Sequence, residues 1–96
     1  MKKITEPLLR NYESRESEIE YLEGNMEYIN VQSDMIRSIG YEPNSSILEI
    51  EFISDNSVWQ YSDFPEFLWY EFQAAPSKGK FFHQQIKKRY SEFRVR

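Results

Sequence analysis

The clearest pattern of hydrophobic and polar positions lies in the middle of the chain, where apolar and acidic residues alternate. Leu48, Ile50 and Phe52 alternate with Glu49 and Glu51. A period of two residues is typical of a β-strand with one buried face and one solvated face. The pattern therefore predicts a strand with its three apolar side chains in the core and both glutamates in water.

Two segments on either side of this strand also have the composition of strands. Both are rich in β-branched and aromatic residues, and the connections to the central strand are short and rich in Asn, Ser, Asp and Pro. Short turns join neighbouring strands in antiparallel order. We therefore expect a three-stranded antiparallel meander over residues 35–41, 47–53 and 57–62.

Helical signals replace the strand pattern after residue 64. Pro65 suits the first position of a short aromatic helix that runs to about Ala74. Pro76 ends this helix, because the residue before a proline is pushed out of the α region. Ser77 can then cap a second helix, with its hydroxyl accepting a hydrogen bond from a backbone N–H group.

The second helix is amphipathic. At about 100° per residue, its inner side collects Gly79, Phe82, Ile86 and Tyr90, and its outer side collects Lys80, Gln84, Lys87 and Lys88. We interpret Gly79 as a residue that permits close approach of another backbone. The alternation in residues 93–96 predicts an edge strand at the C-terminal end.

The first 32 residues differ from the rest, because glutamates are interleaved with widely spaced apolar side chains. Ile19, Leu22 and Met26 fit one helical stripe, which predicts a short helix over about residues 14–23. Two interpretations remain, a solvated acidic helix or a surface for a protein partner. The predicted fold is thus α+β: residues 1–32 form an acidic, partly helical extension, and residues 33–96 form a domain with a meander, two short helices and an edge strand.

Composition excludes several kinds of chemistry. The chain has 96 residues, no cysteine and a single histidine, His83, so disulfides and metal centres built from thiolate or imidazole are not expected. No nucleophile, paired carboxylates or phosphate-loop pattern accompanies His83, and we expect neither catalysis nor a cofactor. The N-terminal residues contain no apolar run, so we predict no signal peptide, no membrane span and a cytoplasmic location.

Charge is distributed unevenly along the chain. The net charge is −4, yet residues 1–56 carry 5 Lys/Arg and 12 Asp/Glu, whereas residues 57–96 carry 7 and 4. All seven basic residues of the second part lie between Lys78 and Arg96. The charge of a local patch is therefore a better guide to binding partners than the net charge of the chain.

The basic C-terminal face, beginning at the start of the second helix, is the best candidate for a binding site. Helix N-termini present backbone N–H groups and a partial positive charge, which suit phosphate, and basic side chains can follow a nucleic-acid backbone. We predict an RNA or single-stranded nucleic-acid partner at this site. Its candidate residues are Ser77, Lys78, Gly79, Lys80, Gln84, Lys87, Lys88 and Arg94. The alternative is that Ser77 is only a cap and that the lysines form a solvated face.

Two aromatic residues on the third predicted strand are a second candidate for nucleic-acid binding. Trp59 and Tyr61 point to one side of the strand, where exposed rings could stack on bases. Core positions are favoured for both, because the aromatic helices of so short a chain need a surface on which to pack.

Several of these segments together resemble the KTSC domain, a small domain at the C-terminus of some lysyl-tRNA synthetases that also stands alone in bacterial and phage proteins. The resemblance covers about residues 34–96. It rests on the segments 36–41, 48–52 and 59–65, and on Ala75-Pro76-Ser77-Lys78-Gly79-Lys80-Phe81-Phe82 followed by Ile86 and Tyr90. The family more often has Tyr at the position of Trp59 and Asn at that of His83. The resemblance implies an α+β module without known catalysis and with a suggested RNA-binding role.

Overall fold

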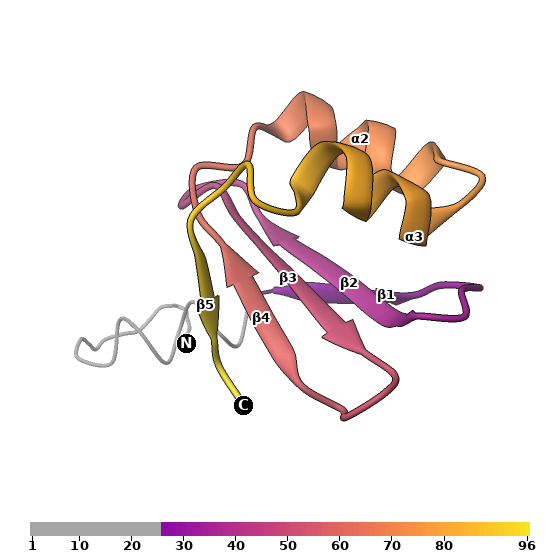
Figure 1. Cartoon of the computed structure of the whole chain (residues 1–96). Helices are drawn as coiled ribbons and strands as arrows, with labels where there is room; N and C mark the ends of the chain where they lie inside the picture. Colours follow the sequence, from indigo (N-terminus) through magenta and orange to yellow (C-terminus); the bar gives the residue numbers. More distant parts are fainter. Residues whose placement is uncertain (1–25) are drawn as a thin grey trace, which may run out of the picture.

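The computed structural model describes residues 26–96, which form an antiparallel sheet with a layer of helices across one of its faces (Figure 1). Five strands lie in the order in which they occur along the chain: β1 (Glu27–Asn30), β2 (Ile36–Glu42), β3 (Ile47–Phe52), β4 (Val58–Tyr61) and β5 (Glu92–Arg94). Between β4 and β5 the chain forms α2 (Glu66–Ala74), α3 (Lys78–Phe81) and the π-helix η1 (Phe82–Ile86).

The predicted meander is confirmed, and the sheet is wider than the sequence indicated. β2, β3 and β4 are the three expected strands, and β5 confirms the predicted edge strand. β1 is an additional strand, formed by residues 27–30 of the segment expected to be an extension. The predicted helix over residues 14–23 and its interaction surface lie outside the described residues.

The predicted register of the central strand is confirmed. Leu48 and Ile50 are fully buried on the helix-covered face. Phe52 lies on the same face at the end of β3, where it is partly buried and meets the ring of Phe82 edge-on at 5.4 Å. The apolar side of the alternation is therefore the core side.

The expectation that Glu49 faces water is wrong. Its side chain is only 3% exposed, although it lies on the sheet face away from the helices. The hydroxyl of Tyr28 donates a hydrogen bond to Glu49 Oε1, and Gln60 Nε2 donates to Glu49 Oε2 at 2.6 Å. The burial results from β1, which the sequence analysis missed and which places Tyr28 beside this carboxylate. The side chain of Glu51 is 26% exposed, which is closer to the predicted contact with water.

Aromatic contacts join the helix layer to the sheet. Phe72 of α2 is fully buried and stacks on Phe81 of α3 with ring centroids 5.0 Å apart. Tyr41 of β2 stacks on Trp69 at 5.5 Å, and its hydroxyl donates to the carbonyl oxygen of Phe64 at 2.5 Å. These contacts fix α2 and α3 on one face of the sheet.

Gly40 and Gly79 differ in how much space surrounds them. A Cβ atom at Gly40 would lie 2.8 Å from Tyr28 Cδ1 and 2.9 Å from the carbonyl oxygen of Glu27, so β1 needs glycine at this position. A Cβ atom at Gly79 would lie 3.5 Å from Met35 Sδ, which is an ordinary contact. The interpretation of Gly79 as a site of close backbone approach is therefore wrong, because only a flexible side chain faces it.

We expect Gly40→Ala to destabilise the domain by about 1–3 kcal/mol, because the methyl group meets a backbone oxygen that cannot move without displacing β1. Gly79→Ala is the matched substitution and should leave stability unchanged or raise it by up to about 1 kcal/mol, because alanine favours helix. Urea denaturation measures both changes. Equal destabilisation by the two variants would contradict this account of Gly40.

We expect Phe72→Ala to cost about 3–5 kcal/mol, the usual range for a truncated core aromatic. Phe67→Ala on the same helix should stay within about 0.5 kcal/mol, because exposed substitutions rarely matter more. The two residues differ in exposure, 0% for Phe72 and 64% for Phe67. Midpoints of urea denaturation at constant slope test the difference, and a large loss for Phe67→Ala would show an unrecognised packing role.

Candidate functional site

The helix break that begins the predicted binding site is confirmed. α2 ends at Ala74, and Ser77 is the N-cap of α3, where its Oγ accepts a hydrogen bond from the Lys80 N–H at 3.2 Å. Phe82 and Ile86 are buried, as predicted. The cap and the inward stripe thus hold the basic side chains of α3 at the surface.

The prediction that Lys80, Lys87 and Lys88 share one helical face is wrong. The helix ends at Ile86, and Lys87 closes a π-turn by donating its backbone N–H to the Phe82 carbonyl at 2.8 Å. Lys88 then adopts a positive φ of 65° in the following turn. The turn lets Tyr90 reach the core, where its ring meets Phe64 edge-on at 5.1 Å. Lys80 and Gln84 therefore lie on helical residues, and Lys87 and Lys88 on the turn that follows.

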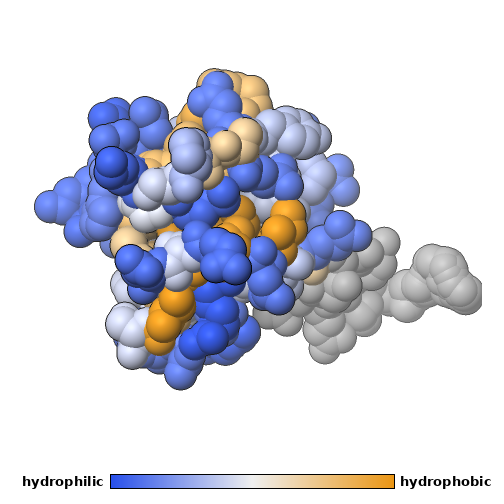
Figure 2. Space-filling model, turned by 90° about the vertical axis from the view of Figure 1, so that its right-hand side faces the viewer, coloured by the Kyte–Doolittle hydropathy of each residue, from blue (hydrophilic) through white to orange (hydrophobic). Residues whose placement is uncertain are grey.

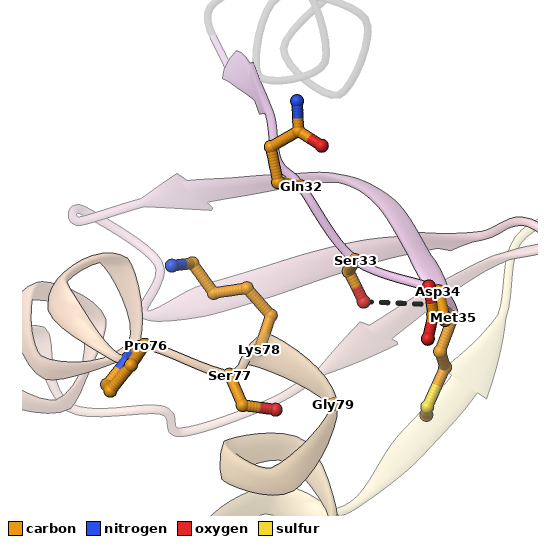
Figure 3. A pocket seen from close by; sticks show the side chains of 8 residues that line it. All are labelled: Gln32, Ser33, Asp34, Met35, Pro76, Ser77, Lys78 and Gly79. Atoms are coloured by element: carbon orange, nitrogen blue, oxygen red, sulfur yellow. Dashed lines mark hydrogen bonds between the residues drawn. The ribbon is translucent and has the colours of Figure 1, made fainter.

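A hollow of about 510 Å³ lies beside the start of α3, between the α2–α3 connection and the β1–β2 connection (Figure 3). Figure 2 looks at this end of the molecule, where hydrophilic residues surround small apolar patches. The lining residues are Gln32, Ser33, Asp34 and Met35 on one side and Pro76, Ser77, Lys78 and Gly79 on the other.

Several polar groups of this hollow already have structural partners. The Lys78 ammonium donates to the carbonyl oxygen of Ala75 at 2.7 Å, just beyond the end of α2. Ser33 Oγ accepts hydrogen bonds from the backbone N–H groups of Met35 and Ile36, each at 3.1 Å. The carboxylate of Asp34 adds a negative charge to the lining. An anion is therefore disfavoured in the hollow relative to the basic surface further along the chain.

Most basic side chains near the C-terminus are exposed. They are Lys80, Lys87, Lys88, Arg89, Arg94 and Arg96. Among residues 26–96, the three lysines of this set form no ion pair, and Arg94 has only a long contact of 4.0 Å to Asp55, with both side chains 54% exposed. Hydrogen bonds from Ser57, and to a lesser extent the charge of Arg94, keep the pKa of Asp55 below its ordinary value. These cations are thus largely uncompensated within the described residues.

The two candidate stacking residues lie in or against the core. Tyr61 is 1% exposed, and burial, followed by the nearby charge of Glu92, raises the pKa of its hydroxyl. Trp59 is partly buried against the core, and its Nε1–H donates to Ser57 Oγ at 3.2 Å. This placement favours the core interpretation of both residues.

Other aromatic rings are exposed, and the sequence analysis did not single them out. Phe93 on β5 is 67% exposed, and Phe67 and Tyr70 on α2 are 64% and 60% exposed. The spacing of α2 contained a usable signal, since positions 67 and 70 fall opposite positions 68 and 72 at about 100° per residue.

Metal and membrane sites are not evident in the part of the chain that the structure describes. Residues 26–96 contain no cluster of three or more His, Cys, Asp or Glu side chains that could hold a metal ion. None of the described helices has the length and hydrophobicity needed to cross a membrane. His83 is exposed, with its ring centroid 5.4 Å from that of Phe82.

The fold and the basic C-terminal surface define a small α+β domain with one helix-covered sheet face. The model of the KTSC domain family matches residues 32–90, so the chain belongs to the KTSC domain family. Its fold matches the crystal structure of a KTSC domain protein from Yersinia pestis, with a TM-score of 0.71 and 37% identity, over 74% of this chain and 99% of that one.

Two sequence relatives place the domain in different contexts. An uncharacterised protein from Stutzerimonas stutzeri is 36% identical over 62 residues, which are 65% of this chain and 86% of the relative. A lysine–tRNA ligase from Nostoc is 38% identical over 56 residues, which are 58% of this chain and only 10% of the ligase. The domain thus occurs both in short proteins and as a small part of a large enzyme.

We expect Ser77→Ala to destabilise the domain by about 1 kcal/mol, the usual cost of losing an N-cap side chain. Ser62→Ala, at an exposed serine outside the helices, serves as the control and should change stability by less than about 0.5 kcal/mol. Urea denaturation checks both variants. No loss for Ser77→Ala would show that the hydrogen bond to the Lys80 N–H does not stabilise the helix start.

Proposed function

We propose that this protein is a small non-enzymatic module that binds RNA or other single-stranded nucleic acid through phosphate contacts. The C-terminal basic segment, residues 78–96, makes these contacts. The observation that best supports this proposal is the charge of the segment. It holds seven Lys and Arg residues, and Glu92 is its one acidic residue.

The geometry of the C-terminal basic segment supports phosphate contacts. Lys80 projects from α3, Lys87 and Lys88 lie on the turn after η1, and Arg94 and Arg96 lie at and beyond β5. All five side chains are exposed. Lys and Arg that neutralise phosphates release condensed counterions, which supplies affinity without base readout. Such a surface suits a flexible strand whose backbone follows the cations.

The helix start contributes less to the proposed site than the sequence suggested. Ser77 and Lys78 already form hydrogen bonds within the protein, and Asp34 lies beside them. We therefore assign the main contacts to Lys80, Lys87, Lys88 and Arg94, with Gln84 between them as a neutral hydrogen-bonding group. Ser77, Lys78 and Gly79 form the border of the site.

The face of the sheet away from the helices is a poor alternative for a polyanion. The strand register puts Glu42, Glu49 and Glu51 on this face. Like charges repel phosphate, and Glu49 is already occupied by Tyr28 and Gln60. Nucleic acid is therefore assigned to the C-terminal basic segment.

A relative supports RNA as the nucleic acid. The lysine–tRNA ligase that contains a similar domain acts, by its name, on a tRNA. A small domain attached to such an enzyme could add backbone contacts to the RNA. By analogy with this relative, we propose RNA as the preferred ligand of this chain.

We expect the triple variant Lys80→Gln, Lys87→Gln and Lys88→Gln to lose most binding to a fluorescein-labelled single-stranded RNA. Each lost phosphate contact should also reduce the slope of log affinity against log salt by about 0.7. Fluorescence anisotropy at several salt concentrations measures both effects.

A charge-matched control separates local contacts from net charge. The triple variant Asn44→Glu, Ser54→Glu and Ser62→Glu changes the net charge equally at exposed residues outside the C-terminal basic segment. Its salt slope should remain that of the wild type. An equal loss of slope in both variants, or no binding of wild type to RNA or DNA at low salt, would contradict the proposed function.

A further inference from the structure

Helix α2 has a second exposed surface that the proposed RNA contacts do not use. Its inner side packs Leu68, Trp69 and Phe72 on the core. Its outer side presents Phe67 and Tyr70, one helical turn apart and each at least 60% exposed. We call the side chains of Glu66, Phe67, Tyr70, Glu71 and Ala74, all exposed, the α2 outer face.

The two aromatic side chains of this face are neighbours on the helix. Residues three apart on a helix lie on the same side, so Phe67 and Tyr70 belong to one surface of α2. The Tyr70 hydroxyl donates to Glu66 Oε2 at 3.2 Å, and this hydrogen bond raises the pKa of Tyr70. The buried residues of α2 attach the helix to the sheet without these rings. The exposed rings of Phe67 and Tyr70 are therefore not needed to hold the helix on the sheet.

The charged residues on α2 and just before it are all negative. Residues 38–77 contain seven acidic residues and no Lys, Arg or His. Asp63 lies just before α2, and Glu66 and Glu71 lie on it. Within residues 26–96, none of these three carboxylates forms an ion pair. The nearest cation in sequence, Lys78, has its ammonium bonded to the Ala75 carbonyl.

We propose that the α2 outer face binds a segment rich in Lys and Arg from a partner protein. Cationic side chains are attracted to aromatic faces, and their aliphatic stems pack on the rings while the charged ends reach the carboxylates. The uncompensated carboxylates complement a basic partner and repel a polyanion. The proposal does not depend on RNA binding, because it uses other residues and the opposite charge.

The test uses the full chain and a fluorescein-labelled amphipathic peptide built of Lys, Arg and Leu. We expect the double variant Phe67→Ser and Tyr70→Ser to weaken peptide binding about tenfold, because two cation–π contacts are lost. Phe93→Ser removes an equally exposed ring, 67% exposed on β5, and should leave peptide binding unchanged. Circular dichroism of each variant verifies that the fold is retained.

The charge component has its own measurement. Glu66→Gln with Glu71→Gln should weaken peptide binding and reduce its salt dependence, because two ion pairs are removed at constant shape. A peptide with Gln in place of Lys and Arg should not compete.

Several outcomes would overturn the proposal. They are unchanged peptide binding in the double aromatic variant, an equal loss for Phe93→Ser, and equal binding of the Gln peptide. Loss of RNA binding in the double aromatic variant with the peptide unaffected would assign the α2 outer face to nucleic acid. Self-association of the wild type that the double variant abolishes, with no peptide binding, would assign it to a second copy.

Discussion

The packing of two short helices on one face of the sheet is the interaction on which the rest of the structure depends. Fully buried Phe72 and Ile86 from the helix layer lie in one core with Leu48 and Ile50 from the sheet. Isolated helices of this length are marginal in water, so α2 and α3 exist because this apolar layer is buried. That packing positions both the C-terminal basic segment and the α2 outer face.

The same packing determines which aromatic residues remain exposed. The chain has seven Phe, seven Tyr and two Trp, more than one thin core can enclose. Once Phe72 and Trp69 face the sheet, helical spacing directs Phe67 and Tyr70 outward. Likewise, pairing with Gln60 places Phe93 on the sheet face away from the helices. Exposure of these rings is thus a geometric consequence of the fold, and it creates surfaces available for binding.

Helix α2 and the segment from α3 to β5 carry opposite charges on separate residues. α2 has acidic and no basic residues, whereas α3, the following turn and β5 hold the basic ones. The two proposed partners, nucleic acid and a basic protein segment, therefore would not compete for the same groups.

Local patterns in the sequence determined the strands β2, β3 and β4, the register of Leu48 and Ile50, the break at Pro76 and the cap at Ser77. These features depend on side-chain periodicity and on the chemistry of proline and serine, which act over a few residues. The acidic-to-basic change along the chain was equally visible without coordinates, and so was the KTSC family.

Only the tertiary structure decided the features that depend on distant segments. β1 has no strong pattern of its own, and its pairing with β2 placed Tyr28 over Gly40 and buried Glu49. The turn after η1, which lets Tyr90 reach Phe64, takes Lys87 and Lys88 off the helical face. Burial and exposure are set by what other parts of the chain cover, and periodicity within one segment does not contain that information.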